Sequence, residues 1–355
     1  MLIVEEFLNK HHIKDKVLAV GVSGGADSLA LALISAKELA VFGRKIVALT
    51  VDHDLRPTSR QEADYVASVM QQYGIEHHIL TWNGDKPQTG IEEAARHARF
   101  ELMRQWCREN QVQCLLLAHH CQDQIETFLM RLQRGSGLEG LCAMREICYR
   151  DNLIILRPFL QKNPEELRQY LTQNNIRWIH DESNDDTRFL RNRIRHFLPE
   201  LYKHTQINPQ RIIDTVNNLQ SAEGFIEEQV EKHKKQYLRK NGNIISFRYS
   251  DYLGWHQEIK FRIFADICRQ EYTPRAERTL SVLDKLNHLP FAGATLGGKE
   301  ILLYHENIWI VPELKSKRKA YREVWKNFSL KHPEFKQQKI PHKAKLAILQ
   351  KEGLL

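Results

Sequence analysis

Short apolar runs alternate with helix-forming stretches along the first 120 residues of this chain. The runs cover residues 16–23, 45–52, 75–81 and 113–119, and the stretches between them cover 27–41, 59–73 and 91–110. Strands that alternate with helices at this spacing form βαβ units. The pattern therefore predicts an α/β fold with a parallel sheet and helices on both faces, which binds ligands at the carboxyl ends of its strands.

The character of the chain changes after Pro199. A long polar helix is predicted over 209–237, followed by helices over 257–270 and 274–288 and glycine-punctuated strands within 291–312. We therefore expect an α/β catalytic domain at 1–205 and a smaller α+β substrate-binding domain at 206–312. Residues 313–355, with 12 Lys and Arg against 4 Asp and Glu, are expected to form a basic tail or a partial third domain.

The positive charge lies in the second part of the chain. Residues 1–200 hold 25 Lys and Arg against 27 Asp and Glu, whereas residues 201–355 hold 27 against 17. Such asymmetry indicates a polyanionic partner, and nucleic acid is favoured over a membrane because no basic amphipathic anchor is evident. A solvated surface that maintains solubility would explain the same charge.

Several classes of protein are disfavoured by composition. At 42% hydrophobic residues the chain is too apolar to be disordered, and no apolar run approaches the ~20 residues that span a bilayer. The first ten residues are acidic where a signal peptide is basic, so a cytoplasmic location is expected. The cysteines form no Cys-x-x-Cys pair and are expected to be reduced thiols; they are Cys107, Cys114, Cys121, Cys142, Cys148 and Cys268.

A glycine-rich turn separates the first predicted strand from the first predicted helix. Free backbone N–H groups and the positive end of a helix dipole suit a phosphate chain at this position. The turn lacks the lysine of a Walker A loop and does not match Gly-x-Gly-x-x-Gly. An ordinary strand-to-helix turn is the alternative to nucleotide binding. The candidate ATP-binding residues are Ser23, Gly24, Gly25, Ala26, Asp27 and Ser28.

The sequence Ser-Gly-Gly-x-Asp-Ser resembles the signature of the PP-loop ATP pyrophosphatases, which split ATP into AMP and pyrophosphate to activate a carbonyl or carboxylate oxygen. Further motifs resemble those of the tRNA(Ile)-lysidine synthetases, and residues 210–312 resemble that family's substrate-binding domain more weakly. The motifs are Val51-Asp52-His53, residues 90–100, Ala118-His119-His120, residues 123–127, residues 134–141, residues 178–184 and residues 191–196.

The resemblance implies a PP-loop, adenine nucleotide hydrolase-like fold and a reaction in two steps. The family adenylates O2 of the first anticodon cytidine of an isoleucine tRNA that bears CAU, and pyrophosphate is released. The ε-amine of free lysine then displaces AMP at C2, which gives lysidine. Codon reading changes from AUG to AUA, and charging changes from methionine to isoleucine. ATP, Mg²⁺, free L-lysine and this tRNA are the implied cofactors and partners, and no membrane partner is expected.

Three candidate catalytic residues follow from the motifs, namely Asp52, Asp123 and Arg193. Asp52 ends the second predicted strand, where it would hold Mg²⁺ or accept a proton from lysine, whose ammonium has an unperturbed pKa of ~10.4. Asp123 and Glu126 share one helix face. By family analogy they bind lysine, with Arg193 as partner of its carboxylate or of the AMP phosphate.

Simpler structural roles would explain these residues as well. Asp52 would also suit an ordinary strand-to-loop turn, and the acidic face of the helix would also suit pairing with Arg131 or Arg134. The family usually has Asp-Asp-Gln where this chain has Gln122-Asp123-Gln124, so a metal role for the first aspartate is not carried over.

A cluster of arginines is predicted to contact tRNA phosphates. Four arginines fall within eight residues after residue 187, and two more lie one turn apart in the stretch 91–110, where pairing with Glu92 is an alternative. His119 and His120 are not predicted to bind metal, because no third ligand has suitable spacing. The candidate tRNA contacts are Arg96, Arg99, Arg188, Arg191 and Arg195.

Two other functions remain as alternatives. A PP-loop tRNA thiolase would share the loop, but such enzymes commonly use paired catalytic cysteines, and the nearest pairs here are six or seven residues apart. A non-catalytic module that binds RNA under the control of ATP would share the loop and the basic half. A homodimer and a monomer are both compatible with this sequence.

Overall fold

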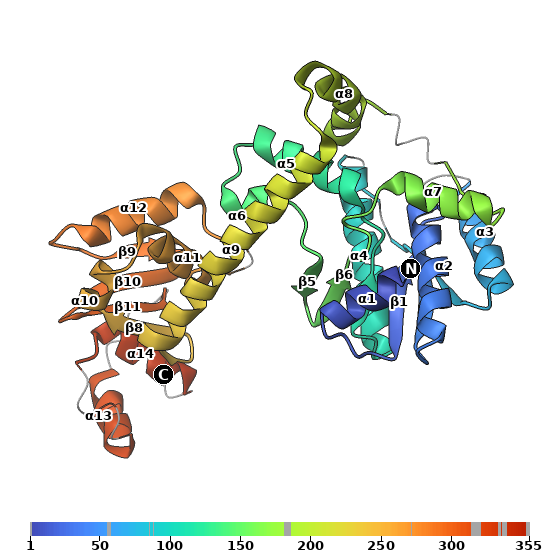
Figure 1. The fold of residues 1–355 in the computed structure, drawn as a ribbon. Coiled ribbons are helices and arrows are strands. Elements are labelled where there is room, and N and C mark those ends of the chain that lie inside the picture. The colour runs from blue at the N-terminus through green and yellow to red at the C-terminus, as the bar shows by residue number, and fades with distance from the viewer. Residues whose placement is uncertain are drawn as a thin grey trace. The chain divides into compact units, whose positions relative to one another are not determined.

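The computed structural model describes residues 2–54, 58–84, 86–87, 89–180, 186–270, 272–313, 321–332, 335 and 339–352. The chain folds into two compact units, Met1–Glu223 and Gly224–Leu355, shown in Figure 1. The division falls inside the long helix α9 (Pro209–Tyr237), whereas the change of composition placed it at residue 205. Ile212 and Ile213 are buried with Leu198 of α8, so the first turns of α9 belong to the first unit.

The first unit is built on a sheet with the strand order β3-β2-β1-β4-β6-β5. Its strands are parallel, except that β5 pairs antiparallel with β6. The strands are β1 (Val17–Gly21), β2 (Lys45–Asp52), β3 (Glu76–Thr81), β4 (Cys114–Leu116), β5 (Ile147–Arg150) and β6 (Leu153–Leu156). The helices are α1 (Ile3–Lys10), α2 (Ala26–Ala40), α3 (Ser59–Gln72), α4 (Ile91–Glu109), α5 (Cys121–Gln133), α6 (Leu138–Leu141), α7 (Pro164–Gln173) and α8 (Leu190–Thr205).

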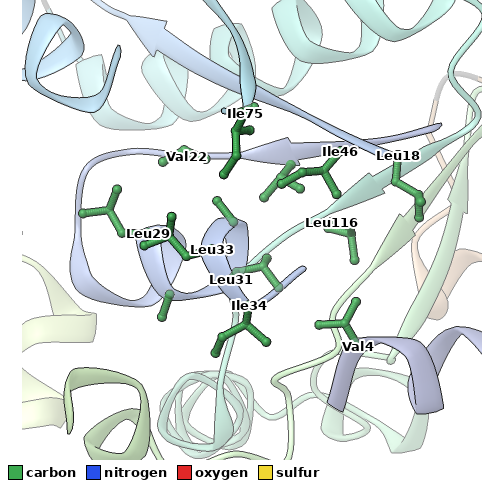
Figure 2. Close-up of a cluster of buried hydrophobic side chains, with 14 of the residues drawn as sticks. Val4, Leu18, Val22, Leu29, Leu31, Leu33, Ile34, Ile46, Ile75 and Leu116 are labelled. Carbon is green, nitrogen blue, oxygen red and sulfur yellow. The ribbon is translucent and has the colours of Figure 1, made fainter. Parts of the chain in front are cut away.

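Alternate residues of the central strands enter different cores, as the two-residue period of a strand requires. Leu18 and Leu116 pack with side chains of α1, α2, α3 and α7, and Figure 2 shows part of this cluster around Leu29 and Leu33 of α2. Ala19 and Leu115 face the opposite side, where α4 covers the sheet. The predicted α/β fold with helices on both faces is therefore confirmed.

The strand order creates a topological switch point at the carboxyl edge of this sheet. From β1 the chain proceeds through β2 to β3 on one side, and it then returns through α4 to place β4 on the other side of β1. The connections that leave β1 and β4 therefore diverge. Ligands of open α/β sheets bind at such a switch point, outside the carboxyl ends of the strands.

The second unit contains an antiparallel sheet with the order β7-β8-β11-β10-β9. Its strands are β7 (Arg239–Asn241), β8 (Ile244–Arg248), β9 (Ala294–Leu296), β10 (Lys299–Tyr304) and β11 (Asn307–Pro312). Its helices, apart from the end of α9, are α10 (Tyr249–Leu253), α11 (Gln257–Ile267), α12 (Ala276–Asn287), α13 (Tyr321–Lys331) and α14 (His342–Lys351).

The described part of residues 313–355 packs against this sheet. Ala344 and Ile348 of α14 are buried with Trp309 and Val311 of β11, on the face opposite to the cluster that contains α11 and α12. This helix is therefore part of the second unit. Within the described residues, no helix combines the length and the apolar character that crossing a membrane requires.

Candidate active site at the edge of the parallel sheet

The glycine-rich turn is closed by its own serine side chains. The hydroxyl of Ser28 donates to the carbonyl of Gly25 at 3.0 Å and accepts the backbone N–H of Ser23 at 3.1 Å. Helix α2 begins directly afterwards at Ala26, so the free N–H groups of its first turn lie at the switch point. The turn therefore offers backbone donors and a positive helix end to an anionic ligand.

Gly24 is the position in this turn that requires glycine. Its φ is +85°, and a Cβ atom would lie 2.5 Å from Cδ1 of Ile179. The carbonyl of Gly24 accepts the backbone N–H of Ile179 at 2.9 Å. The segment after α7 therefore packs directly on the turn.

One side of the turn is formed by the end of β2. Asp52 is 6% exposed, and its Oδ1 accepts the backbone N–H of Asp54 at 2.9 Å. His53 follows, and Arg99 of α4 donates to its Nε2 at 3.4 Å. Burial and the charge of Arg99 lower the pKa of His53 to about 4, so its imidazole is neutral at physiological pH. This side contains one buried carboxylate beside an imidazole and a guanidinium group.

The other side of the turn is formed by the junction of β4 and α5. Nε2 of His120 lies 3.5 Å from Oδ2 of Asp27 and 3.5 Å from Oδ2 of Asp123. His119 is neutral, because burial lowers its pKa to about 4 against the opposing charge of Asp123. The junction thus connects the first turn of α2 with the acidic residues of α5.

Asp123 and Glu126 share one face of α5, as predicted, but this face is buried against α8. Arg191 donates through Nε to Oε2 of Glu126 at 2.6 Å and also hydrogen bonds to Asp123. Arg195 donates to both oxygens of Glu126, at 2.7 and 3.1 Å. The alternative partner Arg131 instead donates to backbone carbonyls of the glycine-rich segment after α5. Buried carboxylates require such pairing, because an unpaired charge is costly to bury.

Arg193, predicted to bind the lysine carboxylate or the AMP phosphate, lies on another face of α8 than the two arginines that pair with Asp123 and Glu126. Residues four apart on a helix share a face, whereas residues two apart lie on nearly opposite faces. Arg191 and Arg195 therefore both reach the carboxylates, and the Arg193 side chain is exposed.

Two other candidate tRNA contacts are exposed. Arg188 pairs with Asp186 at 2.6 Å, and Arg96 lies on α4 close enough to His119 for its charge to lower the pKa of that histidine. The side chain of Glu92 and the motif residues 181–184 lie outside the described residues.

The residues near Asp52 fit a Mg²⁺ ion that arrives with ATP. Over the described ranges, no group of three or more His, Cys, Asp and Glu side chains has an arrangement that could hold a metal ion. Mg²⁺ in nucleotide sites takes only one or two protein carboxylates, and water and phosphate oxygens complete its octahedron. A single buried aspartate at the end of β2 meets that requirement.

Comparison with known proteins assigns the family. Residues 3–201 match the PP-loop domain family. A tRNA(Ile)-lysidine synthase from Wolbachia pipientis wMel is 31% identical over 347 residues, which cover 94% of this chain and 78% of that protein. The chain belongs to the tRNA(Ile)-lysidine synthase family. Another member, from Zymomonas mobilis, is 38% identical over 232 residues, which cover 64% of this chain and 68% of that protein.

The fold of this lysidine synthase family member also resembles a solved structure of different specificity. A U34-tRNA thiolase from Methanococcus maripaludis superposes with a TM-score of 0.53 over 61% of this chain and 77% of that one, at 16% identity. An identity this low shows the fold alone. Use of ATP follows for this chain from its PP-loop family.

Sequence patterns of the lysidine synthase family did not reveal every residue of the site. His120 belongs to one of the motifs and is not predicted to bind metal, but its contacts with Asp27 and Asp123 depend on α2 and α5 beginning at neighbouring strands. Ile179 was noted as part of a motif, but no pattern in the sequence indicated that it lies on Gly24.

Proposed function

We propose that this chain joins free lysine to C2 of the first anticodon cytidine of the CAU-bearing isoleucine tRNA, in a reaction that converts ATP to AMP and pyrophosphate. The observation that carries this proposal is the closed glycine turn at the switch point, between Asp52 and the Asp123–Glu126 pair, in a member of the lysidine synthase family. The turn suits a triphosphate, and the carboxylates on either side suit cations. Both kinds of group are needed when an amine attacks an adenylated base.

The turn Ser23–Ser28 would bind ATP through its backbone donors and hydroxyl groups. Bound Mg²⁺ would supply charge stabilisation for the departing pyrophosphate, and Asp52 would hold it. Because Asp52 lies on β2 and the acidic pair on α5, proton acceptance from lysine suits the acidic pair better than Asp52. We therefore propose that Asp52 holds the Mg²⁺ that accompanies ATP and that it does not accept the proton of lysine.

Asp123 and Glu126 would have different tasks in lysine binding. Glu126 has no exposed surface, and two arginines occupy its oxygens, so its task is to hold Arg191 and Arg195. Asp123 is the carboxylate that an ammonium group of lysine would reach, in exchange for the guanidinium of Arg191. That exchange keeps the local charge constant and frees Arg191 for the lysine carboxylate or the AMP phosphate. We propose Arg191 for this role in place of Arg193.

Three exposed arginines are proposed to contact the tRNA backbone near the site: Arg96, Arg99 and Arg188. A guanidinium group binds phosphate through charge and two parallel hydrogen bonds without reading sequence. Arg193 is exposed on α8 and joins this group. Arg195 remains bound to Glu126 and would act by shaping the lysine site.

Incubation of the chain with ATP, Mg²⁺, labelled lysine and a CAU-bearing isoleucine tRNA tests the proposal. We expect label in the tRNA, with one AMP and one pyrophosphate released for each lysine incorporated. The same tRNA with UAU as anticodon is the matched control and should remain unlabelled. If neither lysine incorporation nor AMP release occurs with the CAU tRNA, the proposal is wrong.

The substitution Asp52→Asn separates a ligase from a non-catalytic ATP-dependent module. A ligase should lose about 100-fold or more in turnover and keep most of its tRNA affinity, whereas a binding module should keep its function. Asp54→Asn is the control, because the Asp54 carboxylate is 77% exposed and faces Lys86. Asparagine also tolerates the positive φ of this position.

Four of the six cysteines disfavour the thiolase alternative. Sulfur transfer requires a thiolate, but burial raises the pKa of Cys107 and Cys114 to about 12 and that of Cys268 to about 11. Burial also raises the pKa of Cys121. These thiols are therefore protonated at physiological pH.

A further inference from the structure

His120 stands between the glycine-rich turn and the acidic pair. It is the N-cap residue of α5 and is 7% exposed. Its Nε2 lies 3.5 Å from an oxygen of Asp27, in the first turn of α2, and 3.5 Å from an oxygen of Asp123, in the first turn of α5. One imidazole therefore connects the two helices that border the proposed ATP and lysine sites.

Two carboxylates lie against the imidazole of His120 and favour its protonated form. Asp27 and Asp123 each place one oxygen 3.5 Å from Nε2. Burial acts to lower the pKa of His120, but the hydrogen bond with Asp27 and the charges of nearby carboxylates outweigh burial and raise it. The facing groups are Asp27 of α2, Asp123 and Glu126 of α5, Arg191 and Arg195 of α8, and His119 of the preceding loop.

His120 and Asp123 form a capping box at the start of α5. The backbone N–H of His120 donates to Oδ2 of Asp123 at 3.0 Å, and its carbonyl accepts the N–H of Gln124 at 3.3 Å. These two backbone bonds survive a change of the side chain. The side chain itself contributes its half of the capping box with Asp123 and its contact with Asp27.

Asp27 keeps an acceptor for a ligand at the turn. Its Oδ1 is buried and, among the residues described, makes no hydrogen bond, while Oδ2 faces His120. A donor group of bound ATP, such as a ribose hydroxyl, would satisfy this oxygen. The orientation of the carboxylate, which His120 controls, would then be transmitted to the nucleotide.

We propose that His120 is a positioning residue for adenylation. As a cation shared by Asp27 and Asp123, it fixes the position of the glycine-rich turn relative to the acidic pair. The inference rests on the proposed function, because that function places ATP at the turn and lysine at the pair. His120 makes and breaks no bond to substrate in this role. Its effect is transmitted through the two carboxylates.

The substitution His120→Gln in the full chain tests this role. Adenylation is measured alone, as pyrophosphate release from ATP and tRNA without lysine, so that the titration of lysine does not enter the pH profile. We expect the single-turnover rate constant of pyrophosphate release to fall about 100-fold, the size of effect that a displacement of about 1 Å has on a reacting group. A structural role alone would not alter the pH dependence, which is therefore the second readout.

The sign of the pH effect follows from the raised pKa. The imidazolium is fully present below the ordinary pKa of ~6.5 and is lost as pH rises through the higher pKa of the folded protein. The unaltered chain should therefore lose adenylation rate on this alkaline limb, and the His120→Gln variant should not show the limb. A variant that keeps both the rate and the limb would overturn the inference.

A double substitution gives an independent test of the contact. Asp27→Asn and His120→Gln break the same link, so the double variant should be no slower than the slower single variant. Multiplicative losses would contradict the proposal. His78→Gln is the control, because His78 pairs with Glu76 at the start of β3 and should not change the rate.

Two further outcomes are informative. If circular dichroism shows that His120→Gln does not fold, Asp27→Asn carries the pH test, since Asp27 is 31% exposed at the start of a helix; retention of the alkaline limb in Asp27→Asn then overturns the inference. If the unaltered chain releases no pyrophosphate with this tRNA, the proposed function fails first. If the unaltered chain is active and both His120→Gln and Asp27→Asn keep its pH profile, only the role of His120 is refuted.

Discussion

At the scale of single residues, the two adjacent glycines of the proposed ATP turn have different requirements. Gly24 has a φ of +85°, and its absent Cβ would meet Ile179 at 2.5 Å, whereas the nearest atom to a Cβ on Gly25 is 3.7 Å away. We predict that Gly24→Ala lowers the free energy of unfolding by about 2 kcal/mol, since an alanine with left-handed φ alone costs about 1–2 kcal/mol. Thermal unfolding followed by circular dichroism measures the change.

Gly25→Ala is the matched control for this prediction. Gly25 has φ −71° and ψ 159°, values that alanine adopts without strain, so its substitution should change stability by about 0.5 kcal/mol or less. If the two variants unfold at the same temperature, the conformation of Gly24 is not what makes glycine necessary there.

The residues of the acidic pair show how far periodicity predicts a site. Spacing on one helix correctly placed Asp123 and Glu126 on a common face. The partner helix begins more than fifty residues later, and its rotation about its own axis depends on packing of Leu198 and Ile194 against α5. The choice of Arg191 and Arg195 over Arg193 therefore required the tertiary structure.

At the scale of elements, the long helices and the apolar strands of the parallel sheet were predictable, and the short edge hairpin was not. The predicted helices at 27–41, 59–73 and 91–110 correspond to α2, α3 and α4 with shifts of one residue. The β5–β6 hairpin was not predicted, since each strand has four residues and Tyr149 of the edge strand is 76% exposed. Such short runs give too few positions to reveal a period of two.

A two-residue turn in the second unit requires glycine at both of its positions. Gly297 and Gly298 connect β9 to β10 with φ of +54° and +68°, as a type I′ turn requires. A Cβ on Gly297 would lie 1.9 Å from the backbone carbonyl oxygen of Cys268, whereas one on Gly298 would meet only the side-chain end of Gln270. The packed backbone at Cys268 cannot move away from an added Cβ atom, whereas the flexible side-chain amide of Gln270 can.

We therefore predict that Gly297→Ala destabilises the second unit more than Gly298→Ala. Both substitutions introduce an alanine with positive φ, at about 1–2 kcal/mol, and displacement of packed backbone adds about 1–3 kcal/mol at Gly297. Urea unfolding followed by tryptophan fluorescence compares the two, because Trp255 and Trp309 are buried in this unit. Equal losses for the two variants would show that the Cys268 segment moves freely.

At the scale of the whole molecule, the two compact units differ in charge. Residues 1–223 hold 27 Lys and Arg against 29 Asp and Glu, whereas residues 224–355 hold 25 against 15, a net charge of +10. The uneven charge was readable from composition, but its boundary was not, since α9 continues through it without interruption. The proposed lysine site lies in the near-neutral unit, where paired charges predominate. The polyanionic tRNA is expected to gain most of its affinity from the other unit.

This division predicts how salt acts on tRNA binding. The edge strand β7 exposes Arg239 and Lys240, and we expect the double substitution of both by alanine to weaken binding and to reduce the slope of log affinity against log salt by about 2, roughly one for each lost phosphate contact. Lys14 and Lys16 provide the matched control, because they are exposed beside the amino end of β1, at the edge of the sheet away from the switch point. Their substitution should leave both affinity and slope unchanged. Filter binding of labelled tRNA from low to high salt measures all three proteins, and equal slopes for the two double variants would place the dominant tRNA contacts elsewhere than β7.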